Sequence, residues 1–430
     1  MQKKPVIWLA LLTVFALVLA ACGSGEETVD AGDTTTSVIA ETTTTTQAVT
    51  TTTEAAPMVE LVIWADENRA KAIEEVIPAF EDKTGVDVII ELVDFGAMKD
   101  QVGVAGPAGE GPDIFIGASD WVGELATNGI LEPIDLGAKA DDFIASAKDG
   151  LTFNGTLYGL PYAVEAIALY YNTDLAPEAP ATMEDAAAAC ADMVDITNCI
   201  GVTGGGDGTD AYHMYPFVSA AGGYVFASTD GIYDPTDVGL DSAGAISGAL
   251  ALETLVKDGV MASVNYDGAK NQFLEGTEPF WITGPWELGA LNDQDTVNWA
   301  VAKLPKIADG TPKPFVGVQG FFLSSFSENK LVAQTFLLDF MATEEGMAAM
   351  FAADGRPPVH NAIIAATADD AAISTFGASA ADGVPIPNIP EMGAVWGALG
   401  DNMAAIRNGT VDAETAMVNA ATAVREAVNQ

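Results

Sequence analysis

The alternation of strand-like and helix-like segments between residues 59 and 117 is the feature that most constrains how this chain folds. The segments are, in order, a strand at 59–64, a helix that Thr84-Gly85 ends, a strand at 86–93, a helix from about Phe95, and a strand at 113–117. In the first helix, Ile73, Val76, Ile77 and Phe80 recur at the spacing of one helix face. Strands and helices that alternate with short connections predict a parallel sheet covered by helices, so we expect an α/β fold.

Polar and aromatic side chains stand at the ends of these predicted strands. Ligands of open α/β sheets bind beyond the carboxyl ends of the strands. These ends are Trp64-Ala-Asp66 after the first strand and Gly117-Ala-Ser-Asp120-Trp121 after the third. A further stretch, residues 159–172 (GLPYAVEAIALYYN), reads as a buried strand with Glu165 in its middle. An unpaired carboxylate is costly there, so we expect Glu165 to have a partner, a ligand or a proton to move.

Acidic and aromatic residues stand together again further along the chain. The positions are Asp210-Ala-Tyr212, Trp286-Glu287 and Trp396. Flat apolar rings beside hydrogen-bond acceptors suit a polar, neutral ligand with one apolar side, above all a sugar ring. Since a single tryptophan is more often part of a core, the prediction depends on the whole set.

The motifs of several enzyme classes are absent from the sequence. There is no Gly-x-x-x-x-Gly-Lys-Ser/Thr loop, no His-Glu-x-x-His and no Cys-x-x-Cys. The two histidines, His213 and His360, stand in no recognisable nucleophile context. Glycoside hydrolysis needs only two carboxylates, so a secreted glycosidase that uses Glu165 with Asp120 or Asp210 stays as the alternative. We expect a protein that is not an enzyme and uses no metal or cofactor.

The first 58 residues have the composition of a targeting segment and a stalk. Lys3 and Lys4 precede an apolar run from residue 6 to 21, which is short for a membrane span of about 20 residues. The sequence Leu-Ala-Ala-Cys22 that follows resembles the lipobox of bacterial lipoproteins, so we expect residues 1–21 to be removed and Cys22 to be lipidated. An ordinary secretory signal or a short anchor helix is the alternative. Residues 22–58 are rich in threonine and lack aromatic residues, which predicts a disordered stalk.

Charge and cysteine content narrow the environment further. The chain has 17 basic and 61 acidic residues, a formal net charge of −44, which argues against nucleic acid and anionic membrane surfaces as partners. Besides Cys22 it has two cysteines, Cys190 and Cys199. In the oxidising compartment that the signal implies, we expect these two to form a disulfide, with two buried thiols as the alternative.

From about Leu61 to the C-terminus the chain resembles the extracellular solute-binding proteins of ABC sugar importers (family 1), and among these the maltose/maltodextrin-binding proteins. The similar segments are LVIWAD, FEDKTGVDV, GEGPDIF, NGILEPI, NGTLYGLPYAVEAIALYYNTDL, AAGGYVF, DVGLDSAGA, ITGPWEL, KPFVGVQ, VPIPNIPEM and GTVDAETAM. The resemblance implies a two-lobed, type II periplasmic-binding-protein-like fold, in which each lobe is a sheet flanked by helices. The implied N-terminal lobe is residues 59–164 and 319–368, and the implied C-terminal lobe is 165–318 and 369–430.

The resemblance also implies a ligand site between the lobes and a hinge that closes over it. The implied ligand-binding residues are Asp66, Arg69, Asp120, Trp121, Glu165, Asp210, Tyr212, Trp286 and Trp396, and the hinge residues are Val316, Gly317 and Gln319. In this family Glu165 and Asp120 match acceptors of sugar hydroxyls, and Trp286 and Trp396 match stacking platforms. Gly117, Leu288, Gly397 and Gly400 depart from the pattern, because maltodextrin binders usually carry larger aromatic or basic side chains there, and Trp121 stands at a position that is usually basic.

The sequence therefore predicts a lipid-anchored receptor on the extracytoplasmic face of a bacterial cell membrane. It would bind maltose, maltodextrin or a related α-glucoside and deliver it to the transmembrane subunits of an ABC permease. Another oligosaccharide or a disaccharide such as trehalose or sucrose is the alternative ligand. By analogy with this receptor design we expect a monomer.

Overall fold

The computed structural model describes residues 60–203, 210–229 and 231–429. The predicted signal peptide at 1–21, the lipidation of Cys22 and the stalk at 22–58 lie outside these residues. Residues 56–430 group into one compact unit. Within the described ranges, no helix combines the length and the apolar character that crossing a membrane requires.

The first part of the chain forms the predicted parallel sheet. It consists of β1 (Glu60–Ala65), α1 (Glu67–Thr84), β2 (Asp87–Leu92), α2 (Phe95–Ala108) and β3 (Ile114–Ala118). β1 pairs in parallel with both β2 and β3, so the predicted strand and helix order is confirmed. Gly85 ends α1 with φ of 71°, a left-handed conformation that favours glycine, as the Thr84-Gly85 signal predicts. The Gly106-Pro107 pair does not end α2, which continues to Ala108 because Pro107 lies in the last turn.

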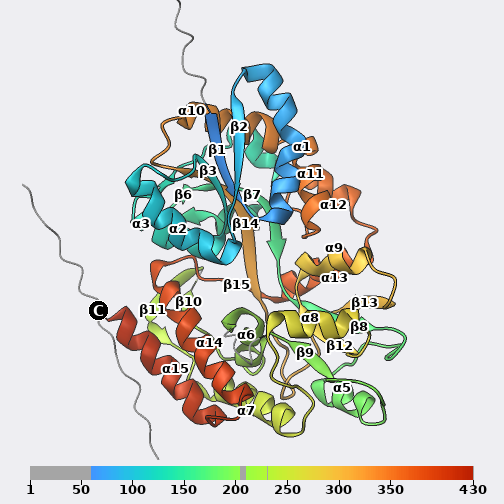
Figure 1. Ribbon diagram of the computed structural model, residues 1–430. Coiled ribbons are helices and arrows are strands. Elements are labelled where there is room, and N and C mark those ends of the chain that lie inside the picture. The colour runs from blue at the N-terminus through green and yellow to red at the C-terminus, as the bar shows by residue number, and fades with distance from the viewer. Residues whose placement is uncertain (1–59, 204–209, 230, 430) are drawn as a thin grey trace, which may run out of the picture. The chain divides into compact units, whose positions relative to one another are not determined.

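A long strand from much later in the chain completes this sheet. β14 (Phe315–Ser324) pairs antiparallel with β3, with β7 (Gly159–Glu165) and with the short β4 (Leu131–Glu132), and parallel with β15 (Val384–Pro385). The path through the sheet is β15-β14-β3-β1-β2. Figure 1 shows β14 running beside β7. Because β14 joins strands from both parts of the sequence, its residues lie between the two sheets of the molecule.

A second sheet follows directly after β7. It has the order β13 (Trp299–Ala302), β8 (Ala168–Asn172), β12 (Phe280–Thr283) and β9 (Ile200–Val202). The prediction of one continuous strand over 159–172 is therefore wrong, because this stretch forms β7 in the first sheet and β8 in the second. Glu165 pairs in register with Gly317 of β14, whereas Ala168 pairs with Thr283 of β12. The change of partner at Ala166 and Ile167 is the point where the chain crosses between the sheets.

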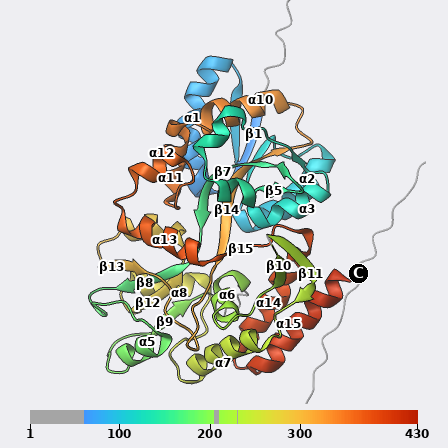
Figure 2. The same cartoon turned by 180° about the vertical axis from the view of Figure 1, so that it is seen from behind.

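Helices cover both sheets. Those with the first sheet include α1, α3 (Val122–Thr127), α4 (Ala145–Gly150), α10 (Lys330–Thr335), α11 (Glu344–Asp354) and α12 (Asn361–Ala366), and those with the second include α5 (Met183–Cys190), α6 (Ala211–Ser219), α7 (Ala243–Lys257), α8 (Tyr266–Leu274), α9 (Leu288–Asn292) and α13 (Ala371–Asp382). The last helices, α14 (Gly393–Arg407) and α15 (Ala413–Val428), pack on each other and on α7, as both views show (Figures 1 and 2). A hairpin of β10 (Phe226–Thr229) and β11 (Ile232–Val238) lies beside α15.

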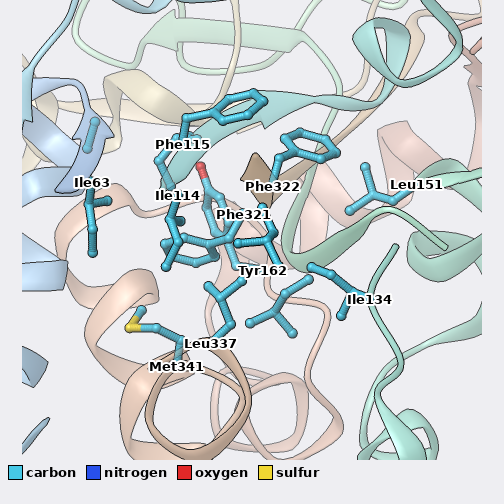
Figure 3. Packing of buried hydrophobic residues seen from close by; sticks show 14 of the residues in the cluster. Ile63, Ile114, Phe115, Ile134, Leu151, Tyr162, Phe321, Phe322, Leu337 and Met341 are labelled. Carbon is cyan, nitrogen blue, oxygen red and sulfur yellow. The ribbon is translucent and has the colours of Figure 1, made fainter. Parts of the chain in front are cut away.

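Separate hydrophobic clusters lie under the two sheets. The first draws its buried residues from 61–163 and 318–363, and Figure 3 shows Ile63, Ile114, Phe321, Phe322 and Tyr162 packed together in it. The second draws on 167–315 and 386–424, and a third, with Trp281 and Phe376, lies on the other face of the second sheet. A disulfide joins Cys190 at the end of α5 to Cys199 before β9, with 5.8 Å between their Cα atoms. Two sheets with their own cores and flanking helices form the two-lobed α/β architecture that was predicted.

Candidate functional site

Glu165 lies at the end of β7, where the chain leaves the first sheet, and its residue is 9% exposed. Gln319 of β14 donates from Nε2 to Glu165 Oε1 at 2.9 Å, and Arg356 donates from Nε to Oε2 at 2.5 Å. Gly317 stands opposite Glu165, and a Cβ at that position would come within 3.2 Å of Glu165 Cγ. The carboxylate is therefore held by two donors of the protein itself, and the glycine leaves it room.

Arg356 belongs to a buried network of alternating charge. Its guanidinium also pairs with Asp354 Oδ1, and that oxygen lies 3.9 Å from Nε of Arg69. Arg69 in turn pairs with Asp66 and donates to the Tyr162 hydroxyl at 2.7 Å. Burial acts to lower the pKa of Arg356, but Asp354 and Glu165 outweigh it and hold that pKa above its ordinary value. Arg356 stays charged because its counterions are as buried as it is.

Asp66 and Arg69 have local reasons for their positions. Asp66 is the N-cap of α1, where its carboxylate accepts from the backbone N–H groups of Asn68 and Arg69. The first turn of the helix then directs Arg69 inward, and its guanidinium carbon lies 4.6 Å from the centre of the Phe95 ring. A cap and a cation–π contact thus orient one end of the network.

Four aromatic rings adjoin this network from the second half of the chain. Trp286, in a short 3₁₀ helix (Pro285–Glu287) after β12, lies under the guanidinium of Arg356 at 5.5 Å. Its ring is 6.1 Å from that of Tyr212 on α6, which is 6.3 Å from Phe315 of β14. Phe315 is 5.8 Å from Trp396 on α14. The ring set Trp286, Tyr212, Phe315 and Trp396 forms a continuous aromatic surface beside Glu165 and Arg356.

Asp120 lies in a short 3₁₀ helix (Ser119–Trp121) that follows β3. Burial raises the pKa of its carboxyl to about 6, and the charge of Glu165 raises it further, against the backbone hydrogen bond, Lys99 and a hydrogen bond from Trp396. Asp120 therefore lies near both Glu165 and Trp396, as a half-buried acceptor that changes its charge just below neutral pH.

Asp210 is the N-cap of α6. It accepts from the backbone N–H of His213 at 2.9 Å, and its other oxygen lies 2.6 Å from His213 Nδ1. Burial acts to raise the pKa of Asp210, but His213 and these hydrogen bonds outweigh it and lower that pKa. His213 meets the Trp286 ring edge-on at 5.7 Å, so Asp210 orients a side chain that supports the aromatic surface.

Trp121 lies apart from the ring set. It is 8% exposed and belongs to the first hydrophobic cluster, where its ring packs 4.9 Å from Phe95. Sequence reasoning missed Arg356, Asp354, Phe315 and His213. Arginine is scarce, at four of 430 residues, and this scarcity in a strongly acidic chain is the one signal that could have drawn attention to Arg356.

The site can hold a polar ligand with an apolar face. It offers carboxylate acceptors at Asp120 and Glu165, a guanidinium at Arg356, and aromatic rings to cover an apolar side. Within the described ranges, no three or more His, Cys, Asp or Glu side chains are grouped so as to hold a metal ion.

Comparison with known proteins agrees with this arrangement. A model of the family described as bacterial extracellular solute-binding protein matches residues 75–376. The galactooligosaccharide-binding protein of Bacillus subtilis (strain 168) is 28% identical, over 98% of this chain and 96% of its own. A maltooligosaccharide ABC transporter solute-binding lipoprotein of Streptococcus pneumoniae (strain ATCC BAA-255 / R6) is also 28% identical with the same coverage. The maltotriose-binding protein of Pyrococcus abyssi (strain GE5 / Orsay) is 31% identical over 70% of this chain and 67% of its own.

The family model spans more than half of the chain, including β7, the crossing between the sheets, β14, and the Arg356 network except for Asp66 and Arg69. The chain belongs to the bacterial extracellular solute-binding proteins.

Proposed function

We propose that this protein is the substrate-binding component of an ABC importer and that it captures an oligosaccharide. The observation that carries the proposal is the ring set of Trp286, Tyr212, Phe315 and Trp396 beside Glu165 and Arg356. Aromatic faces cover the apolar sides of sugar rings, while charged acceptors and donors bind hydroxyl groups. Relatives named for galactooligosaccharide, maltooligosaccharide and maltotriose support the ligand class.

Within this class we propose maltose, maltodextrin or a related α-glucoside as the ligand. The contacting residues would be Asp66, Arg69, Asp120, Trp121, Glu165, Asp210, Tyr212, Trp286 and Trp396, to which the geometry adds Arg356 and Phe315. A galactooligosaccharide is the second candidate, because the Bacillus subtilis relative named for that ligand matches nearly the whole chain. Trehalose and sucrose complete the set of candidates.

The same proposal includes a mode of closure. The lobes would be residues 59–164 with 319–368 and residues 165–318 with 369–430. The crossing at Ala166–Ile167 and the β14 residues Val316, Gly317 and Gln319 would act as the hinge. The location of Glu165 and Gln319 at these crossings supports a coupling between ligand contact and lobe closure.

The N-terminal segment would hold the protein at the extracytoplasmic face of the membrane. In this proposal residues 1–21 are removed, Cys22 carries lipid, and residues 22–58 are the stalk. The Streptococcus pneumoniae relative is named a lipoprotein, which supports this reading. The protein would act as a monomer that delivers its ligand to the transmembrane subunits of the permease.

Thermal unfolding with a panel of sugars tests the proposal. The panel is maltose, maltotriose, longer maltodextrins, galactooligosaccharides, trehalose, sucrose and cellobiose. A ligand at about 100-fold over its Kd should add ~2.7 kcal/mol to the free energy of unfolding. Trp286→Ala should weaken binding at least ~10-fold, because it removes a stacked ring. Phe326→Ala, which truncates an aromatic residue that is 42% exposed and outside the ring set, is the matched control. No shift with any sugar would contradict the proposal.

A glycosidase is the second candidate, favoured by one observation. Asp120, with a pKa of about 6, lies near Glu165, and pairs of carboxyl groups in different environments serve as acid and base. We expect no turnover, because protein donors already occupy both oxygens of Glu165. Incubation with a maltooligosaccharide and an assay for new reducing ends would reveal hydrolysis if it occurs.

A further inference from the structure

A cavity of about 460 Å³ lies beside Trp286, outside the ring set. Its walls include Asn68 and Lys71 from the start of α1, Lys270 from α8, Gly289 from α9, and Asp354 at the end of α11. The volume falls in the range of ~300–1,000 Å³ that is usual for small-molecule pockets. Trp286 itself lines the cavity, so the same indole contacts Tyr212 and Arg356 in the ring set and borders this space.

An unpartnered carboxylate oxygen lines this cavity. Asp354 is 6% exposed, and its Oδ1 pairs with Arg356 and lies 3.9 Å from Arg69. Its Oδ2 is buried and has no hydrogen-bond partner among the described residues. A buried acceptor without a donor is costly, so a donor supplied by a bound molecule would stabilise this oxygen.

The other lining residues indicate the chemistry of that molecule. Two cationic residues, Lys71 and Lys270, are balanced by Asp293, Asp354 and Asp370 in the same lining. Lys270 is already engaged, because its Nζ lies 2.9 Å from Glu287 Oε2. Asp354 is likewise compensated by two arginines. A mixed polar lining of this kind suits a neutral group that donates hydrogen bonds, such as a sugar hydroxyl, better than a cation or an anion.

Small side chains keep the cavity open. Gly289 is exposed, and a Cβ built on it would meet no atom within 4 Å. A larger residue there would project into free space and leave the backbone of α9 in place. Position 289 can therefore be used to fill the cavity without disturbing the ring set.

We propose that this cavity is a further subsite, which takes an additional sugar unit of an oligosaccharide whose main part lies on the ring set. A hydroxyl of that unit donates to Asp354 Oδ2, and the indole of Trp286 separates the two subsites. The inference rests on the proposed function, since it assumes an oligosaccharide ligand. It adds that the ligand is longer than the ring set alone can hold.

Calorimetric titration of Gly289→Leu with ligands of increasing length tests the subsite. The probes are maltose, maltotriose, maltotetraose and maltopentaose, with galactooligosaccharides of matching length as a second series. For the wild type we expect affinity to rise with length. Gly289→Leu should leave the affinity for the disaccharide within about 2-fold and weaken the longest bound ligand by at least ~10-fold. Ala188→Leu, an exposed position on α5 away from the cavity, is the matched control and should change neither.

The outcomes separate this inference from the proposed function. If the wild type binds sugars and Gly289→Leu changes all lengths equally, or none, the subsite is wrong while the proposed function stands. If the wild type binds no sugar of any length, both are wrong. Asp354→Asn offers a second test, because it keeps an oxygen for Arg356 and replaces the free acceptor with a donor. It should show the same loss confined to longer ligands, and an equal loss at every length would assign Asp354 to the ring set instead.

Discussion

Two groups of buried charge in this protein are stabilised in different ways. In the first group, Glu165, Arg356, Asp354 and Arg69 alternate in sign and form ion pairs. In the second group, Glu278 and Arg407 are 0% and 2% exposed, and they form no ion pair in the part of the chain that the structure describes. Arg407 donates instead to the backbone carbonyls of Val202 and Ala262.

Glu278 has a correspondingly different environment. Its Oε1 accepts from Asn198 Nδ2 at 3.3 Å, and its Oε2 has no partner among the described residues. Burial raises its pKa well above the ordinary value, although Arg407 and Asn198 oppose this, and burial lowers the pKa of Arg407 to about 10. The first group stays charged beside the aromatic surface, whereas in the second group burial disfavours charge and the contacts join β9 to α14. The difference teaches that ion pairing here marks the ligand site, and backbone hydrogen bonding marks a structural contact.

Removal of Arg356 should produce the largest effect. Arg356→Met leaves Glu165 and Asp354 without their shared counterion, and loss of one partner of a buried pair costs ~3–5 kcal/mol. Denaturant unfolding should show this loss, and titration calorimetry should show no measurable sugar binding. Arg356→Lys, which keeps the charge but not the two-sided donation, should recover part of the stability. If Arg356→Met were as stable as the wild type, the first group would not differ from the second in the way described.

Glu165→Gln should separate binding from stability. Glutamine keeps an acceptor for Arg356 but loses the negative charge, so hydrogen bonds that involve the charged group weaken by ~1.5–3 kcal/mol. We expect sugar affinity to fall about 10- to 100-fold, by calorimetry, while the protein stays folded. Glu278→Gln is the matched control in the second group and should leave affinity unchanged. Equal affinity losses in the two variants would remove the functional distinction.

Glu278→Gln should show the opposite sign in stability. The folded-state pKa of Glu278 is raised, so the folded protein binds the proton more tightly than the unfolded chain and loses stability as pH rises from the unfolded pKa through the folded pKa. Glutamine stays neutral and avoids this loss. At pH 8 we expect the variant to match or exceed the wild type by ~1–2 kcal/mol in denaturant unfolding, and near pH 4 the advantage should vanish. A variant that is less stable at pH 8 would show that Glu278 is charged and paired with Arg407.

Asp120→Asn should have the smallest effect and the clearest dependence on pH. As an acceptor of sugar hydroxyls, Asp120 must lose its proton, so wild-type affinity should fall about 10-fold from pH 7 to pH 5, through the pKa of about 6. Asparagine does not titrate, and its affinity should be weaker at pH 7 but flat across this range. Calorimetry at several pH values checks both curves. A wild-type profile that is flat between pH 5 and 7 would exclude Asp120 as an ionised acceptor.

Local patterns account for much of what the sequence predicted. The order β1, α1, β2, α2, β3 follows from apolar periodicity, and the end of α1 follows from Gly85, because only neighbouring residues decide these features. The aromatic and acidic residues of the site were found because they stand at element ends. Tyr212, Trp286 and Trp396 meet in the ring set as members of one constellation, whereas Trp121 packs against Phe95.

Long-range partners were beyond such patterns. The stretch 159–172 was predicted as one strand because its apolar residues are continuous, yet β14 pairs with its first half and β12 with its second. Arg356 lies 191 residues from Glu165, in a segment whose own pattern gives no sign of a site. Neither partner leaves a local signal near the residue that it contacts.

The sequence by itself determined the α/β class, the boundaries of the first helices and strands, and the acidic and aromatic composition of a sugar site, since each depends on periodicity or on adjacent residues. The tertiary structure alone decided which charges are neutralised, which rings share a surface and where a cavity stays open. Pairing across the crossing brings Arg356 to Glu165 and leaves Asp354 Oδ2 without a donor, because burial and electrostatic energy depend on distances between atoms that are far apart in the chain.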